Sequence, residues 1–166
     1  LVEGQTKEVQ FSFDTNHGTD DYLKIIEGKT ASLIKTSAKL GAMASGCKQE
    51  TISSISKWAW HSGIIFQITD DILDLSSDEK TLGKPSGNDI IEGTYTLPVL
   101  IALEKYPEKI NKILSDISEN KVGVNEVINE FNNDEIISES KLFLKTHLEK
   151  SESAAEEIDN KTVRNI

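Results

Sequence analysis

Three aspartates and a glutamine stand close together at the end of an apolar stretch of the chain. They are Gln67, Asp70, Asp71 and Asp74. On an α-helix Asp70 and Asp74 lie one turn apart, about 6 Å along the axis, and Asp71 is turned about 100° from Asp70. Like charges this close repel one another, and Mg²⁺ typically binds one or two carboxylates together with water and substrate phosphates. The spacing therefore predicts a divalent-metal site, with Gln67 a turn earlier on the same side.

A solvated acidic surface is the alternative interpretation, because the chain holds 28 Asp and Glu against 18 Lys and Arg, a net charge of −10. Metal binding is favoured, because the aspartates follow an apolar run directly and aspartate is a poor residue for a helix interior. A calcium-binding loop that begins at Asp74 is excluded. Its sixth position is Glu79 where glycine is needed, and its twelfth is Pro85 where glutamate is needed.

A second candidate is the tripeptide Gly28-Lys29-Thr30, which is similar to the end of a phosphate-binding P-loop. The full pattern requires glycine at position 23, where this chain has Leu23, and a preceding strand, which is not predicted. A P-loop is therefore excluded. A glycine between two helical segments permits a kink, which would aim Lys29 and Thr30 into a cleft. A solvated lysine is the alternative.

A third candidate is the segment Leu82–Asp89, which contains two glycines and a proline. These residues are expected to form a defined loop, in which Lys84 would balance charge near the aspartates. An ordinary turn is the alternative.

The elements that carry these residues are predicted to be helical, because apolar residues recur at intervals of three and four. The expected helices span residues 30–45, 51–75, 96–103, 110–117, 124–131 and 134–158. Residues 76–93 are expected to form a loop, and 9–13 an extended connector. The predicted apolar stripe of the first helix consists of Leu33, Ile34, Ala38, Gly41 and Ala42, with Gly46 as its stop. One all-α unit over residues 1–166 is the simplest arrangement.

Composition excludes several classes of protein. The charge of −10 argues against a nucleic-acid binder, which needs a cationic face. The longest apolar run is far shorter than the roughly 20 residues of a membrane span. The single cysteine, Cys47, excludes an intrachain disulfide and favours a reducing compartment such as the cytoplasm.

Together the motifs resemble the C-terminal half of a trans-prenyl diphosphate synthase. Residues 66–74, Phe-Gln-Ile-Thr-Asp-Asp-Ile-Leu-Asp, resemble the family's second aspartate-rich motif, FQxxDDxxD. Residues 82–98 are similar to its GKPxGxD…G…TLP segment, Lys29-Thr30 to its KT motif, and Glu3-Gly4-Gln5 to the glycine-containing helix before it. The aspartate-rich run looks most like the large catalytic subunits of heteromeric heptaprenyl or hexaprenyl synthases.

This resemblance implies an all-α isoprenoid synthase bundle that extends an allylic diphosphate with isopentenyl diphosphate, using Mg²⁺ as cofactor. It also implies a homodimer or a heteromer with a small subunit. The roles carried over are metal ligands at Asp70, Asp74 and, directly or through water, Asp71; allylic diphosphate binding at Lys29 and Lys84; contact near the reacting carbons at Thr30 and Gln67; and a place beside the metals for Gln5.

The departures from the family pattern are informative. The first DDxxD motif is absent, since Asp20-Asp21 has no aspartate at the fifth position, and Arg164 is the only arginine. We therefore expect this chain to form one wall of an active site and to be inactive alone. The alternatives are a non-catalytic dimerisation or regulatory subunit of a prenyltransferase, and an acidic helical interaction module.

Overall fold

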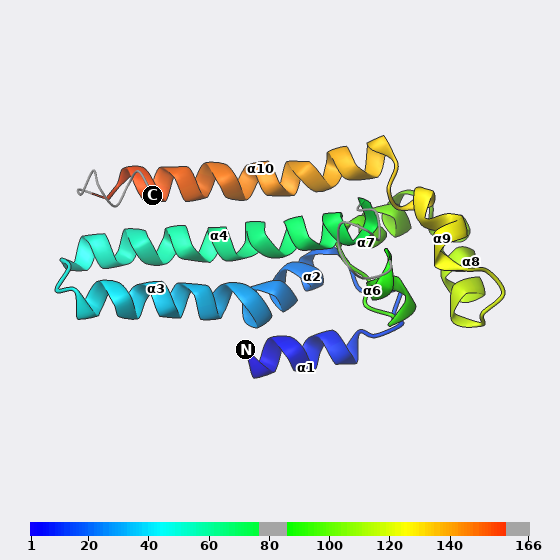
Figure 1. Ribbon diagram of the computed structural model, residues 1–166, viewed down its shortest axis with the longest axis horizontal. Helices are drawn as coiled ribbons and strands as arrows, with labels where there is room; N and C mark the ends of the chain where they lie inside the picture. Colours follow the sequence, from blue (N-terminus) through cyan, green and yellow to red (C-terminus); the bar gives the residue numbers. More distant parts are fainter. Residues whose placement is uncertain (77–85, 159–166) are drawn as a thin grey trace.

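The computed structural model describes residues 1–76 and 86–158, and in these ranges the chain forms helices and turns without a strand. Three helices run side by side along the longest dimension: α3 (Ser32–Ala44), α4 (Gln49–Ser76) and α10 (Asp134–Glu156) (Figure 1). The middle helix, α4, packs against both of the others. The prediction of an all-α fold is confirmed.

The ends of these helices follow local rules. Gly46 has φ +71°, a left-handed conformation that glycine adopts without steric cost, and it ends α3 as predicted. The side chain of Asn133 accepts a hydrogen bond from the backbone N–H of Ile136 at 3.1 Å and so caps the start of α10. The predicted apolar stripe of α3 is partly wrong, because Leu33 and Gly41 are exposed.

The N-terminal elements are α1 (Val2–Gln10), α2 (Thr19–Ile26) and a π-helical turn, η1 (Glu27–Ala31), which leads directly into α3. The prediction of an extended connector over residues 9–13 is wrong, because its first two residues end α1 and the other three are not extended. Residues 11–13 form a turn. A hydrogen bond from the N–H of Phe13 to the carbonyl of Gly93, at 2.8 Å, ties this turn to a segment much further along the chain.

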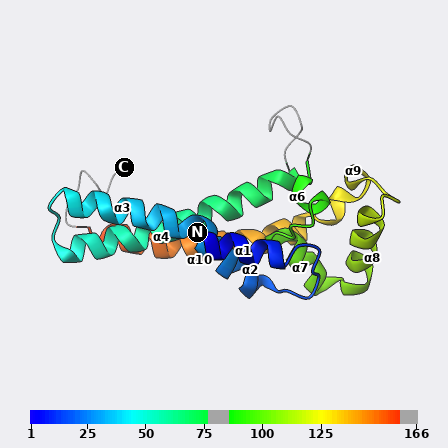
Figure 2. The same cartoon turned by 90° about the horizontal axis from the view of Figure 1, so that it is seen from below.

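Shorter helices gather at one end of the three-helix layer (Figures 1 and 2). They are α6 (Asn88–Ile91), α7 (Leu97–Lys105), α8 (Pro107–Ser118) and α9 (Val124–Val127), followed by a 3₁₀ turn (Ile128–Glu130). Two predictions need correction here: α6 interrupts the expected loop 76–93, and the expected helix 124–131 is divided into two short turns.

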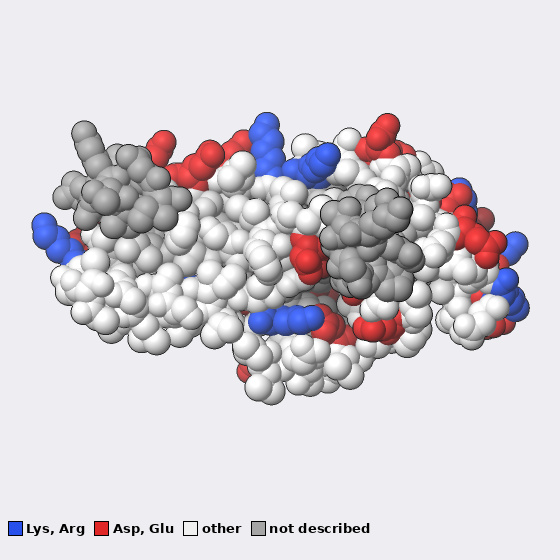
Figure 3. All heavy atoms as spheres, in the orientation of Figure 1, with Lys and Arg blue, Asp and Glu red and all other residues white. Residues whose placement is uncertain are grey.

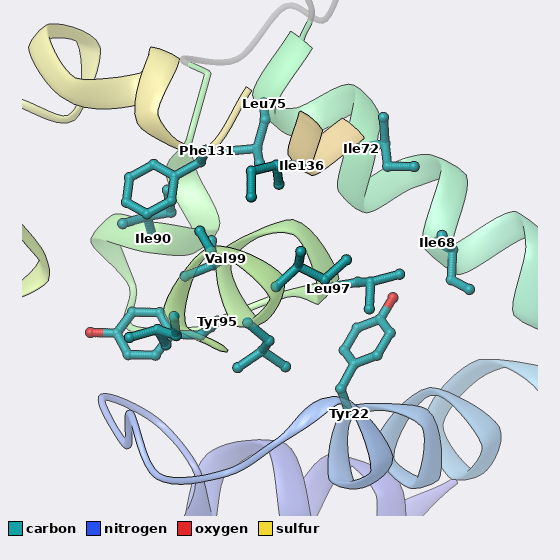
Figure 4. Close-up of a cluster of buried hydrophobic side chains, with 14 of the residues drawn as sticks. Tyr22, Ile68, Ile72, Leu75, Ile90, Tyr95, Leu97, Val99, Phe131 and Ile136 are labelled. Atoms are coloured by element: carbon teal, nitrogen blue, oxygen red, sulfur yellow. The ribbon is translucent and has the colours of Figure 1, made fainter. Parts of the chain in front are cut away.

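The hydrophobic core lies where α7 passes between the other elements. Residues 97–103 of α7 are all buried, and Pro98 stands in its first turn, where the missing N–H leaves no gap in the helix. Side chains from α2, α4, α6 and α10 pack around it (Figure 4). Within the described ranges, every helix is too short or too polar to cross a membrane.

Candidate functional site

A cleft of about 170 Å³ opens between α1, α2, the π-helical turn and α4. Five carboxylates line it together with one lysine: Glu8, Asp70, Asp71, Asp89, Glu92 and Lys29. Figure 3 shows acidic side chains and a lysine around a depression near the middle of one face, while much of the surface over α3 and α4 on that face is uncharged. Such a concentration of carboxylates is electrostatically unfavourable unless cations share the cleft.

Close backbone contacts position the lysine and threonine of the π-helical turn. A Cβ on Gly4 of α1 would lie 2.3 Å from the backbone nitrogen of Lys29, and a Cβ on Gly63 of α4 would lie 2.7 Å from Cα of Ala31. Only glycine permits helices to approach this closely. The chain therefore widens into a π turn between two neighbouring helices, a local irregularity that is frequent at functional sites.

The ammonium group of Lys29 is held by Glu8. Its Nζ donates to both carboxylate oxygens, at 2.7 and 2.9 Å, and both side chains are partly buried. Gln5 lies outside the cleft lining, on the exposed side of α1, where its Nε2 also donates to Glu8 at 2.9 Å. Glu8 is thus the α1 residue that lines the cleft.

A run of hydrogen bonds connects the other candidate residues. The hydroxyl of Thr30 donates to Oε1 of Gln67 at 2.7 Å, and Nε2 of Gln67 donates to Oδ1 of Asp71 at 2.9 Å. The hydroxyl of Tyr22 donates to Oδ2 of Asp71 at 2.5 Å. The fold thus brings Thr30 and Gln67 together across 37 residues of sequence.

The three aspartates of the motif have different environments. Asp70 is exposed, whereas Asp71 and Asp74 are each 3% exposed. Burial raises the pKa of the Asp71 carboxyl to about 7; the hydrogen bonds from Tyr22 and Gln67 oppose this shift, and the nearby charges of Asp89 and Asp70 add to it. Burial also raises the pKa of Tyr22 well above its usual value, so that its hydroxyl stays protonated and donates to Asp71.

The donor chemistry of the cleft fits a hard divalent cation, because carboxylate oxygens are the ligands that Mg²⁺ prefers. Within residues 1–76 and 86–158, no three His, Cys, Asp or Glu side chains are grouped closely enough to hold an ion on their own. This arrangement suits an ion of which protein carboxylates supply only one or two ligands. Of the three aspartates of the motif, Asp70 is the exposed one. Lys84 lies outside the described residues.

The cleft residues that received no role from the sequence include Glu8, Tyr22 and Asp89. Glu8 contacts Lys29 across 21 residues and Tyr22 contacts Asp71 across 49, and each pair joins two different helical segments, so no spacing along a single helix could indicate it. Asp89 belongs to the segment that resembles the family's GKPxGxD motif, and the resemblance assigned this aspartate no role.

Comparison with known proteins assigns the family. The sequence model described as Polyprenyl synthetase matches residues 1–134. The chain belongs to the polyprenyl synthetase family. It is 32% identical to heptaprenyl diphosphate synthase component 2 of Bacillus subtilis over 148 residues, which cover 89% of this chain and 42% of that protein. It is 42% identical to a prenyl transferase of Synechocystis over 107 residues, 64% of this chain and 33% of that one.

Solved structures of polyprenyl synthases share the fold. The crystal structure of heptaprenyl diphosphate synthase from Staphylococcus aureus superimposes with a TM-score of 0.89 at 31% identity, covering 99% of this chain and 52% of that one. The predicted isoprenoid synthase fold and the resemblance to heptaprenyl synthases are thus confirmed. This polyprenyl synthetase chain spans about half the length of that structure.

Proposed function

We propose that this chain supplies the metal- and diphosphate-binding wall of a prenyl diphosphate synthase, which extends an allylic diphosphate with isopentenyl diphosphate. The observation that carries the proposal is the position of Asp70, which lines both the acidic cleft and a second, apolar groove of about 640 Å³. Trp58, Phe66, Leu73 and Leu148 contribute to this groove. A polar site for a charged head that meets an apolar groove for a hydrocarbon tail suits an amphiphilic prenyl diphosphate.

In this proposal Asp70 and Asp74 bind Mg²⁺ directly, and Asp71 does so directly or through water. The metal, when bound, supplies positive charge that stabilises the departing diphosphate. Lys29 binds the diphosphate, and its present partner Glu8 keeps the ammonium group at the cleft wall until an anion arrives. Lys84 has the same role by resemblance, and Gln5 a place near the metals.

Thr30 and Gln67 act near the reacting carbons. Because the Thr30 hydroxyl donates to Gln67, its oxygen lone pairs are directed away from that bond and toward other neighbours. A neutral, oxygen-rich group of this kind stabilises developing positive charge without acting as a nucleophile as strong as a carboxylate.

The apolar groove supports the further proposal that this chain is one half of the complete site. Phe66 is 63% exposed and Trp58 39% exposed, an unusual amount of apolar surface to leave in water. Because the Staphylococcus aureus structure has nearly twice the length of this chain, we propose that additional helices close the groove in the whole enzyme. The chain alone is expected to bind ligand and to catalyse no condensation.

A second candidate function is a non-catalytic subunit of a prenyltransferase assembly. The name of the Bacillus subtilis relative, component 2, describes that protein as one component of a heptaprenyl diphosphate synthase. A homodimer or a heteromer with a small subunit, in the cytoplasm, fits either function. The third candidate function is that of an acidic helical interaction module.

Calorimetric titration with inorganic pyrophosphate and with a non-reactive farnesyl diphosphate analogue, each with and without Mg²⁺, tests the proposal. We expect Mg²⁺-dependent binding of both ligands and tighter binding of the farnesyl analogue. Phe66→Asp should remove only the advantage of the tail, and Asp70→Ala with Asp74→Ala should abolish both. Unchanged binding in the double variant would favour the interaction module, and no coupled binding in the parent would favour the non-catalytic subunit.

A further inference from the structure

A buried tyrosine stands behind the aspartate-rich motif. Tyr22 of α2 is 4% exposed, and its hydroxyl donates to Oδ2 of Asp71 across 49 residues of sequence. Figure 4 shows its ring beside Leu97, with the hydroxyl directed toward α4. This contact ties α2 to the segment of α4 that carries the motif.

When Asp71 is ionised, the hydrogen bonds beyond Tyr22 have one possible direction. An ionised carboxylate only accepts, so Asp71 takes one hydrogen bond from Tyr22 and one from the amide nitrogen of Gln67. The amide oxygen of Gln67 then faces Thr30 and accepts from its hydroxyl. Asp71 therefore sets the orientation of the Gln67 amide, and the amide in turn sets the direction of the Thr30 hydroxyl.

Asp70 and Asp71 are adjacent in sequence and opposite in environment. Asp70 is exposed where the cleft and the groove meet. Both oxygens of Asp71 are already engaged by neighbouring donors in the protein interior. The helix turns about 100° between them, so only one of the two faces an incoming ligand fully.

We infer that Tyr22 is a positioning residue of the site: it holds Asp71 as the acceptor that orients Gln67 and Thr30, while Asp70 alone of this adjacent pair faces the ligand. The ligand in this inference rests on the proposed function. The hydrogen-bond network does not, because it is formed entirely by side chains of this protein.

Tyr22→Phe removes the hydroxyl and keeps the buried ring. The matched control is Tyr95→Phe, since Tyr95 is also buried and lines the same cleft, and its hydroxyl has no hydrogen-bond partner within the described part of the chain. The measurement is the hydrogen-exchange rate of the Gln67 side-chain amide by ¹⁵N NMR, assigned from its loss in Gln67→Glu. Loss of a hydrogen bond to a charged group changes the equilibrium between the closed and open forms by about a factor of ten or more. We therefore expect exchange of the Gln67 amide to accelerate about tenfold in Tyr22→Phe and to stay unchanged in Tyr95→Phe.

A reversal of polarity tests the direction of the network. In Asp71→Asn the new amide accepts from Tyr22 but presents a donor to the donor of Gln67. The Gln67 amide should therefore turn over, so that its nitrogen donates to the Thr30 hydroxyl and its oxygen no longer accepts from it. Adding Gln67→Glu provides a carboxylate that accepts from both Thr30 and the amide at position 71. The double variant then has the same total charge as the parent protein. We expect Asp71→Asn to weaken Mg²⁺-dependent pyrophosphate binding roughly tenfold, and the double variant to recover most of it.

The outcomes separate this inference from the proposed function. Unchanged amide exchange in Tyr22→Phe overturns the inference. So does a double variant that binds as poorly as Asp70→Asn, because Asp71 would then be needed as a direct metal ligand. If the parent protein binds no Mg²⁺ and pyrophosphate, the proposed function fails, and the amide exchange still decides whether Tyr22 orients Gln67.

Discussion

Replacing Gly4 with alanine should destabilise the protein through one atom. The new Cβ would lie 2.3 Å from the backbone nitrogen of Lys29, 2.6 Å from the carbonyl carbon of Gly28 and 2.9 Å from the carbonyl oxygen of Ile25. All three are backbone atoms, so no side chain can rotate away. Carbon contacts are comfortable at about 3.5–4 Å, and α1 must therefore move by about 1 Å from the π-helical turn.

The magnitude follows from two opposing contributions to the free energy of unfolding. Overpacking costs about 1–3 kcal/mol, and a clash with three backbone atoms belongs to the upper part of that range. Alanine in place of glycine returns about 1 kcal/mol of helix propensity. The net loss is about 1–2 kcal/mol, which corresponds to a decrease of about 3–6 °C in melting temperature for a chain of this size.

The assay is thermal and urea unfolding of Gly4→Ala beside Gly41→Ala. A Cβ on Gly41 of α3 meets no atom within 4 Å, so this control should gain up to about 1 kcal/mol from helix propensity. Hydrogen exchange of α1 should also accelerate in Gly4→Ala if the helix detaches locally. Equal stabilisation by the two substitutions would refute the argument that close packing at Gly4 positions Lys29.

Three further predictions concern the cleft, a helix end and the histidines. Glu8→Gln removes the ion-pair partner of Lys29; because such partly exposed pairs are worth about 0.5–1 kcal/mol, calorimetry should show pyrophosphate binding two- to fivefold tighter, and weaker binding would contradict this. Asn133→Ala removes the cap of α10 and should cost about 1 kcal/mol in urea unfolding, whereas an unchanged midpoint would mean that the cap contributes nothing. Nδ1 of His61 lies 3.1 Å from Nδ1 of His147, and burial lowers the pKa of His147 from 6.5 to about 4. Between these values the unfolded chain binds the proton that the folded chain does not, so stability should fall as the pH falls through this window; His147→Gln should flatten the profile, and an unchanged slope would exclude the histidine as its cause.

Several features of the site could be predicted because they depend on neighbours along the chain. The spacing of Gln67, Asp70 and Asp74 on one helix follows from 3.6 residues per turn, and α4 carries all three as expected. Gly28 indicated an irregularity before Lys29, and the chain forms a π turn there. In each case the backbone geometry of a few consecutive residues was sufficient.

Burial was harder to predict, and α3 shows why. Its apolar residues are spread around the helix, so several stripes fit the same sequence, and Leu33 was assigned to the wrong one. Which stripe is buried depends on where α4 packs, and Gly63 and Ala31 determine that contact. Likewise, the sequence treats Asp70 and Asp71 alike, whereas packing exposes the first and buries the second.

The residue types, their helical spacing and the order of the motifs were sufficient to identify the family and the candidate ligands, because these properties are local and survive in the linear chain. The partners of those ligands were not accessible in this way. Glu8 meets Lys29 across 21 residues, and Tyr22 meets Asp71 across 49. Such pairs form only when helices from separate parts of the chain pack together, and the energy of each contact depends on the burial that this packing creates.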